Sequence, residues 1–205
     1  MSAETIPEMP FEKPHPAPRR VTVAEYFALD RASEVRLEYL DGAVRAMAGE
    51  TPEHNRIVKN ISIRLDAAYG ERQCDVFIEN IRTRVSRTRY RYPDIAALCG
   101  PAEFDDQSPP SLLNPAVIFE VLSPSTEEAD HNDKFDEYEG IETVTDYLLV
   151  AQDEIKVLHY TRKSPRNWDL VIYRDATDVL TLSSLNASIS VSDIYRRTKV
   201  IEPAA

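Results

Sequence analysis

Residues 117–126 read VIFEVLSPST, and the run from Val117 to Ser123 has the composition of a buried β-strand. A glutamate, Glu120, stands in the middle of this apolar run. A buried carboxylate without a partner costs several kcal/mol, or its pKa rises until the group is neutral. We therefore expect a specific partner for Glu120, and the identity of that partner bears directly on function.

The whole chain has the size and composition of one globular domain with modest extensions. It contains 205 residues, of which 42% are hydrophobic and 29% are charged. It has no apolar run of about 18 residues and no apolar N-terminal stretch typical of a signal peptide, which predicts a cytoplasmic protein without membrane spans. Two cysteines, Cys74 and Cys99, are too few for a disulfide framework or a metal-ligand set, so we expect reduced, buried thiols.

Caps, turns and periodicity predict alternating helices and strands. We expect a disordered proline-rich tail over residues 1–20, one domain over residues 21–197 and a short tail over residues 198–205. Within the domain we expect a helix starting at Thr22, a hairpin around Asp41-Gly42, a helix from Thr51 to Gly70, and two strands between Cys74 and Leu98 with a turn at 85–88. Beyond these lie the Glu120 strand, a helix capped by Ser125 and Thr126 and ending at Gly140, and strands at 146–150, 155–160, 168–173 and 179–182. Such an order makes a mixed sheet flanked by helices, in the α/β (α+β) class.

A second carboxylate, Asp94, lies in another apolar stretch, Tyr92 to Leu98. Two carboxylates on adjacent strands of one sheet repel each other and raise each other's pKa. A hard divalent cation such as Mg²⁺ or Mn²⁺ removes this conflict and can also activate a water beside a phosphodiester. The alternative is structural: Glu120 pairs with a nearby arginine and Asp94 caps a turn.

Two basic side chains are expected near this carboxylate pair. Lys134 is the single Lys or Arg between residues 101 and 154, among fifteen Asp and Glu. It shares one helix stripe with Asp130 and Tyr138, so it forms either a surface pair with Asp130 or an ammonium aimed at a phosphate. His54 lies in the first turn of the long helix, either exposed or placed to meet a phosphate at the helix start.

Charge is distributed unevenly along the chain. The formal net charge of −11 argues against a nucleic-acid partner. Residues 82–91, RTRVSRTRYR, nevertheless hold five arginines and no acid, directly before Tyr92. We expect Arg87, Arg89 and Arg91 to form a positive surface that guides a nucleic-acid backbone, unless they serve internal ion pairs.

Several stretches together resemble a known family. They are TVAEYFAL, YLDGAVRAM, the start of the long helix at His54-x-x-Ile57-Val58, YPDI, FEVLSPST, and Asp130-x-x-x-Lys134-x-x-x-Tyr138 ahead of DYLLV. Over roughly residues 21–195 the chain is similar to the Uma-type endonucleases of bacteria, within the PD-(D/E)xK restriction-endonuclease-like superfamily.

This resemblance implies a helix–strand–strand–strand–helix–strand core with an N-terminal hairpin and a C-terminal β-rich extension. It also implies that Asp94 and Glu120 bind Mg²⁺, with the backbone carbonyl of Val121 as a further ligand. One position departs from the superfamily pattern, because Leu122 stands where a lysine is usual, two residues after the glutamate. Lys134 is then expected to supply the ammonium from the following helix.

The sequence thus predicts an endonuclease that hydrolyses DNA with Mg²⁺ or Mn²⁺, using Asp94, Glu120, Lys134 and His54. Two alternatives stay open. One is an inactive nuclease-fold module for binding or interaction, which the acidic composition favours. The other is a metal-dependent hydrolase of a small phosphate ester. The oligomeric state also stays open, a homodimer included.

Overall fold

The computed structural model of the chain describes residues 19–47, 49–122 and 129–201, with the backbone alone for residues 129–133. The helices in these ranges are α1 (Val23–Ala32), α2 (Pro52–Tyr69), α3 (Ala129–Glu139), α4 (Val191–Ile194) and the 3-10 turn η1 (Ser183–Leu185). The strands are β1 (Leu37–Leu40), β2 (Ala43–Ala46), β3 (Cys74–Ile78), β4 (Thr83–Ser86), β5 (Arg89–Arg91), β6 (Ile95–Cys99), β7 (Val117–Leu122), β8 (Asp146–Ala151), β9 (Val157–Ser164), β10 (Asn167–Tyr173), β11 (Val179–Leu182) and β12 (Ala187–Ser190).

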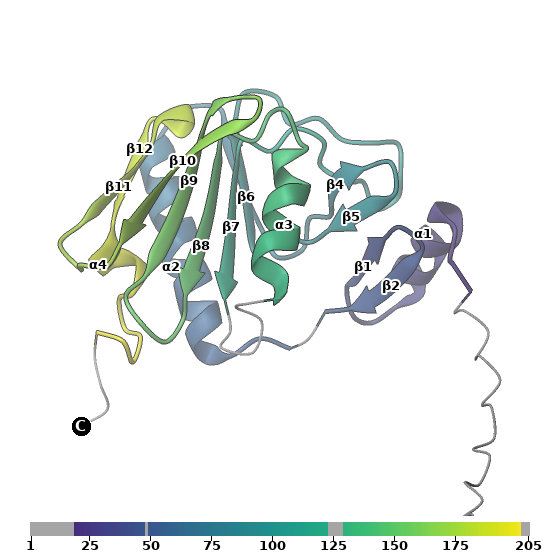
Figure 1. The fold of residues 1–205 in the computed structure, drawn as a ribbon, viewed down its shortest axis with the longest axis horizontal. Coiled ribbons are helices and arrows are strands. Elements are labelled where there is room, and N and C mark those ends of the chain that lie inside the picture. The colour runs from purple at the N-terminus through teal and green to yellow at the C-terminus, as the bar shows by residue number, and fades with distance from the viewer. Residues whose placement is uncertain (1–18, 48, 123–128, 202–205) are drawn as a thin grey trace, which may run out of the picture.

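A mixed six-stranded sheet forms the centre of the molecule (Figure 1). Its strand order is β10-β9-β8-β7-β6-β3, in which β7 and β8 are parallel and the other neighbours are antiparallel. Helix α2 covers one face of this sheet and α3 covers the other. The predicted sheet flanked by helices is therefore confirmed.

The strand that carries Glu120 divides its side chains between these two faces. Phe119 and Val121 pack in the core under α2, whereas Ile118 and Leu122 pack on the side of α3. Because successive side chains of a strand point to opposite faces, Glu120 points toward α3. All six residues of β7 are buried, as the apolar run predicts.

Helix α2 begins and ends where its sequence signals predict. The Thr51 hydroxyl accepts a hydrogen bond of 3.1 Å from the backbone N–H of His54, and Pro52 is the first helical residue. Gly70 closes the helix with a φ of 56°, a conformation that costs glycine little. The Thr51 hydroxyl also donates to the side-chain oxygen of Gln152 at 2.5 Å, which fixes the start of α2 beside the end of β8.

A smaller four-stranded sheet, of order β2-β1-β5-β4, lies with α1 at one end of the molecule (Figure 1). The predicted capping box at Thr22 and the predicted turn at Asp41 and Gly42 are both confirmed. Four aromatic side chains hold α1 on this sheet, namely Tyr26, Phe27, Tyr39 and Tyr90. Burying each of them contributes on the order of 1.5–3 kcal/mol.

Between residues 74 and 99 the chain forms four strands, so the prediction of two strands is wrong. The predicted turn is present, and it joins β4 to β5 in the small sheet. The flanking strands β3 and β6 pair with each other in the main sheet. Period-two alternation runs through all four strands and therefore does not reveal where the chain leaves one sheet for the other.

The C-terminal strands divide in a similar way. Three predicted strands become β8, β9 and β10 of the main sheet, whereas β11 pairs with β12 in a separate hairpin. The prediction missed β12 and α4. β11, β12 and α4 pack their apolar side chains, among them Leu180, Ile189 and Ile194, into the core that α2 covers.

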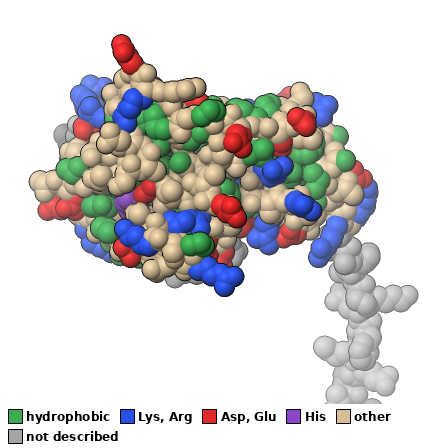
Figure 2. Space-filling view, turned by 90° about the horizontal axis from the view of Figure 1, so that it is seen from above, with side chains coloured by type: hydrophobic (Ala, Val, Ile, Leu, Met, Phe, Trp, Pro, Cys, Tyr) green, Lys and Arg blue, Asp and Glu red, His purple; other side chains and the backbone are tan. Residues whose placement is uncertain are grey.

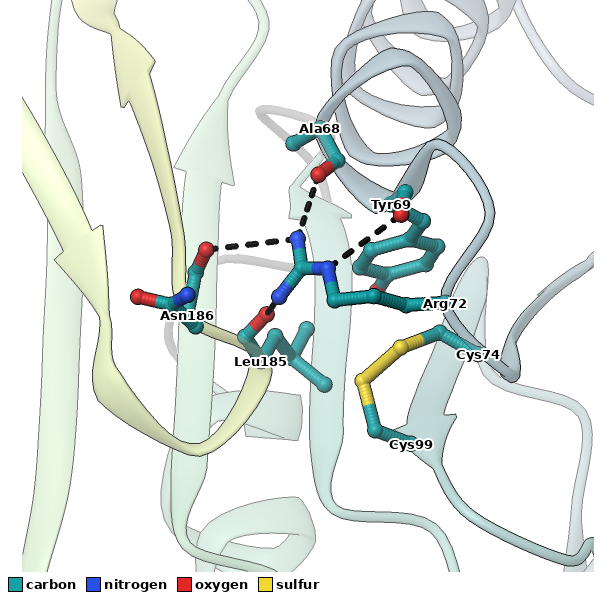
Figure 3. Close-up of a disulfide and its surroundings, with 7 residues drawn as sticks. All are labelled: Ala68, Tyr69, Arg72, Cys74, Cys99, Leu185 and Asn186. Atoms are coloured by element: carbon teal, nitrogen blue, oxygen red, sulfur yellow. Dashed lines mark hydrogen bonds between the residues drawn. A yellow bond between two sulfur atoms is a disulfide. The ribbon is translucent and has the colours of Figure 1, made fainter.

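Cys74 and Cys99 are joined in a disulfide (Figure 3), so the prediction of reduced, buried thiols is wrong. The two residues face each other across β3 and β6, and Cys99 is exposed. They stand 25 residues apart in sequence, and only the pairing of the two strands brings them together. Nearby, the Arg72 guanidinium donates to the Leu185 carbonyl oxygen at 2.8 Å, which ties the end of α2 to η1 (Figure 3).

Some predictions concern residues beyond the described ranges. These are the caps at Ser125 and Thr126 and most of the two tails, so the tails and the domain boundaries stay predictions. None of the helices within the described ranges combines the length and the hydropathy needed to cross a bilayer.

Candidate functional site

The predicted carboxylates come together where β6 begins. Ile95 pairs with Phe119, so continuing this antiparallel register by one residue sets Asp94 opposite Glu120. Side chains in directly opposite positions have Cβ atoms about 4.5–5.5 Å apart. Asp94 itself lies in a bend immediately before β6 rather than within the strand, and both side chains are buried.

Two side chains of α3 bind Glu120. The Lys134 ammonium lies 2.9 Å from one carboxylate oxygen, and the Tyr138 hydroxyl donates to the other at 2.7 Å. The Glu120 side chain is 5% exposed and that of Lys134 is 18% exposed, so this ion pair is mostly withdrawn from water. Glu120 is thus held by lysine and tyrosine rather than by an arginine.

The environment of Glu120 disfavours its charged form. Burial raises the pKa of Glu120 from 4.5 to about 7; the Asp94 charge adds to this rise and the Lys134 charge opposes it. Burial alone would lower the pKa of Lys134, but the charges of Glu120 and Glu38 raise it overall, so Lys134 stays cationic. Burial and then the Glu120 charge hold the pKa of Tyr138 well above its usual value, so its hydroxyl remains a donor.

Asp94 contacts both β7 and the start of α2. Its Oδ2 accepts a hydrogen bond of 2.6 Å from the backbone N–H of Val121 and lies 3.1 Å from Nε2 of His54. The same imidazole nitrogen lies 3.3 Å from a carboxylate oxygen of Glu50. His54 is buried, so it is not the exposed first-turn residue that the sequence left open.

Glu50 was missed by the sequence analysis. It precedes His54 by four residues and stands just before the helix cap at Thr51, where nothing in its spacing distinguishes it from other acids of the chain. Its side chain is 41% exposed, so Glu50 lies between the buried His54–Asp94 pair and solvent. Burial raises the pKa of Glu50 even so.

Glu50, His54 and Asp94 form a group that could hold a metal ion, with ligand atoms within 4.8 Å of one another. Opposite ligands of an octahedral Mg²⁺ ion lie about 4.2 Å apart, at twice the usual metal–oxygen distance. The imidazole Nδ1 of His54 is buried without a hydrogen-bond partner among the described residues, which leaves Nε2 as the ring nitrogen that faces both carboxylates. Carboxylates together with one imidazole suit Mn²⁺ as well as Mg²⁺. The residues present therefore fit a divalent cation.

The protonation of His54 is linked to this group. Burial by itself lowers the pKa of His54, but the hydrogen bond and charge of Asp94, followed by the charge of Glu50, raise it overall. A proton on this imidazole therefore compensates part of the negative charge that a metal ion would otherwise compensate. A proton on His54 and a metal ion therefore compete for the group of Glu50, His54 and Asp94.

The arginine block lies differently from its prediction. Arg91 is buried, with its guanidinium 2.7 Å from Glu137 of α3 and 2.6 Å from Glu38 of β1. Arg89 is partly exposed and contacts Asp41 at 2.6 Å. The expectation that Arg91 lies on an open positive surface is wrong, because its partners are acids far away in the sequence.

The remaining arginines of the block divide between core and surface. Arg82 is buried and pairs with Asp30 at 2.8 Å, whereas Arg84 and Arg87 are exposed. On the face shown in Figure 2, basic and acidic side chains are interspersed rather than gathered into one basic area. Of the three arginines expected to guide a nucleic acid, Arg87 is thus the one on the open surface.

Comparison with known proteins identifies a matching family and a protein of similar fold. The family model Uma2, described as "Putative restriction endonuclease", matches residues 23–192. The chain is 33% identical to the uncharacterized protein sll1609 of Synechocystis sp. over 72% of this chain and 84% of that protein. It is 30% identical to the uncharacterized protein slr1290 of the same organism over 93% of this chain and 95% of that protein.

A crystal structure of a "putative nuclease belonging to DUF820" from Anabaena variabilis has a similar fold, with a TM-score of 0.69 and 17% identity over 85% of this chain and 97% of that one. The likeness confirms the predicted restriction-endonuclease-like fold.

Proposed function

Since this chain belongs to the Uma2 family of restriction-endonuclease-like proteins, we propose that it is an endonuclease that hydrolyses DNA phosphodiester bonds with Mg²⁺ or Mn²⁺. The observation that carries this proposal is the 2.9 Å contact between Lys134 and Glu120. Leu122, at the usual lysine position, is buried in the apolar core. Lys134 reaches the same carboxylate from α3 and so restores the combination of two acids and one ammonium.

Glu50, His54 and Asp94 would hold the divalent cation. Glu120, whose oxygens contact Lys134 and Tyr138, and the backbone carbonyl of Val121 are the further ligands that the family resemblance implies. A bound Mg²⁺ or Mn²⁺ ion supplies Lewis-acid activation of a water and neutralises charge on the phosphodiester. The protein orients this group through its own hydrogen bonds. Val121 N–H holds Asp94, and Tyr138 holds one oxygen of Glu120.

Lys134 is the electrostatic component of the site. Its permanent positive charge is fixed by the ion pair with Glu120, so it needs no reorganisation when negative charge develops on a phosphate. Its partial exposure leaves the ammonium able to contact a substrate. As a compact point charge it suits a phosphate oxygen.

The test is plasmid cleavage with Mg²⁺ or Mn²⁺ by the wild type and by Lys134→Met. We expect Lys134→Met to lose at least about a hundredfold in rate, the loss typical for removal of one preorganised group that stabilises transition-state charge. The matched control is Lys59→Met, which removes an exposed lysine of α2 and should leave the rate unchanged. Equal cleavage by wild type and Lys134→Met would remove the basis of the proposal.

A second candidate is the nuclease-fold binding module without catalysis. The observation that favours it is that Arg82, Arg89 and Arg91 are engaged in ion pairs, in a chain with a net charge of −11. Calorimetric titration separates the two candidates, because the enzyme binds Mg²⁺ or Mn²⁺ and loses this binding in Asp94→Asn and Glu120→Gln. A chain that binds neither ion and cleaves no DNA is the binding module.

A further inference from the structure

The outer edge of the main sheet carries an apolar strand that is not covered by the described chain. Strand β10 ends the sheet, and no strand in the described ranges pairs with its free side. Leu170, Val171 and Ile172 are exposed by 46%, 48% and 45%. Soluble proteins usually protect edge strands with charges, prolines or bulges, because the free N–H and C=O groups recruit other strands. In β10 a bulge occurs at the start, between Asn167 and Trp168, and Asp169 is charged, but the exposed centre from Leu170 to Ile172 is apolar.

We propose that β10 pairs with β10 of a second copy of this chain, antiparallel and about a two-fold axis at Val171, which continues the sheet across a homodimer. The first argument is symmetry. A two-fold axis perpendicular to the sheet keeps each side chain on its own face, so facing residues must be separated by an even number of positions. The dyad therefore passes through a residue, and the candidates at the centre of the strand are Leu170, Val171 and Ile172.

Charge and apolar pairing favour Val171 as the position of the two-fold axis. An axis at Leu170 sets Asp169 against the apolar Val171, and an axis at Ile172 sets Asp169 against Asp175 of the other copy. An axis at Val171 sets Val171 against itself and Leu170 against Ile172, twice. Apolar cross-strand pairs stabilise a sheet, whereas like charges directly opposite each other destabilise it.

The flanking residues are complementary in the same register. Asp169 faces Tyr173 of the other copy, so a carboxylate meets a hydroxyl donor. Trp168, whose ring already contacts the Arg162 guanidinium of its own copy at 4.3 Å, faces Arg174 of the other copy. Both contacts occur twice because of the two-fold axis. The edge is therefore complementary to itself from Trp168 to Arg174.

Segments of the same chain are poorer occupants of this edge. Residues 1–18 contain five prolines, Pro7, Pro10, Pro14, Pro16 and Pro18, and each lacks the N–H that a strand ladder requires. Residues 202–205 are too few to cover β10 and include Pro203. The opposite edge, β3, lacks a run of exposed apolar residues.

Sedimentation velocity of the full chain between about 1 and 100 μM tests the proposal. The wild type should sediment as a dimer, and Val171→Lys should raise the dimer dissociation constant at least about tenfold, because the two introduced ammonium groups face each other. Leu29→Lys, on α1 at the other end of the molecule and exposed by 46%, is the matched control and should remain a dimer. A monomeric wild type, or a dimer that Val171→Lys leaves intact, would overturn the proposal.

Cysteine substitution tests the register and does not depend on the folding of Val171→Lys. Val171→Cys should form an intermolecular disulfide under mild oxidation, because directly facing positions are close enough for an S–S bond. Leu170→Cys alone should not crosslink but should do so when mixed with Ile172→Cys. Crosslinking no greater than that of Leu29→Cys would contradict the β10 pairing. The inference does not rest on the proposed nuclease function.

Discussion

Replacing Glu120 with glutamine should change how the stability of the protein depends on pH. Burial raises the pKa of Glu120 from 4.5 in the unfolded chain to about 7 in the fold, with Lys134, Asp94 and Tyr138 as the titratable groups facing it. The folded state therefore binds the proton more tightly than the unfolded state. Its contribution to stability is fully present below pH 4.5 and is lost as the pH rises to about 7. The difference between the two pKa values corresponds to about 3 kcal/mol.

Urea unfolding of the wild type and Glu120→Gln between pH 4.5 and 8, with a chelator present, measures this quantity. The free energy of unfolding of the wild type should fall relative to that of the variant by about 3 kcal/mol over this range. The comparison cancels groups that titrate equally in both proteins. A difference that stays constant with pH would show that Glu120 is not desolvated in the fold and would refute the reasoning.

Metal provides the internal control for the same experiment. An ion that binds only the folded protein adds about 2.7 kcal/mol when its concentration is a hundred times its dissociation constant. Mg²⁺ or Mn²⁺ should therefore restore most of the lost stability of the wild type at pH 8. Glu120→Gln should gain much less, because one oxygen ligand has lost its charge.

Three further predictions concern the charged groups and the disulfide. Arg91→Met should lower the free energy of unfolding by about 3–5 kcal/mol, because it leaves buried carboxylates unpaired, whereas Arg87→Met should change it by about 0.5 kcal/mol or less; urea unfolding checks both. His54→Gln should weaken Mn²⁺ binding more than Mg²⁺ binding in calorimetric titrations, since imidazole is a better ligand for Mn²⁺, and an equal loss for both ions would argue against an imidazole ligand. Replacing Cys74 and Cys99 with serine should cost about 3 kcal/mol of stability, since the disulfide closes a loop of 25 residues, and an unchanged melting temperature would contradict this.

The sequence was sufficient for much of the fold because its local signals agree with one another. Caps at Thr22 and Thr51, the Asp41-Gly42 turn and the apolar run around Glu120 each act within a few residues, and each predicts its element correctly. The family resemblance predicted that Lys134 supplies the ammonium that the superfamily usually carries at the position of Leu122. The structure brings Lys134 to Glu120.

The features that the sequence did not reveal depend on contacts between distant segments. Cys74 meets Cys99 only because β3 and β6 pair in one particular register. Glu50 joins the site only because the His54 imidazole that it contacts also meets Asp94, 40 residues away along the chain. The inward position of Arg91 depends on Glu137, 46 residues away along the chain.

Arg91 of the arginine block therefore supports the candidate site from inside the protein. Arg91 joins Glu137 of α3 to Glu38 of β1, so the small sheet holds α3 at a fixed position. Lys134 lies on the same helix, almost one turn before Glu137, so a fixed α3 keeps its ammonium beside Glu120, 2.9 Å away. A lysine supplied by a separate helix needs such an anchor, because β7 itself no longer sets its position. Arg91, which the sequence placed on a nucleic-acid surface, thus fixes the helix that carries Lys134.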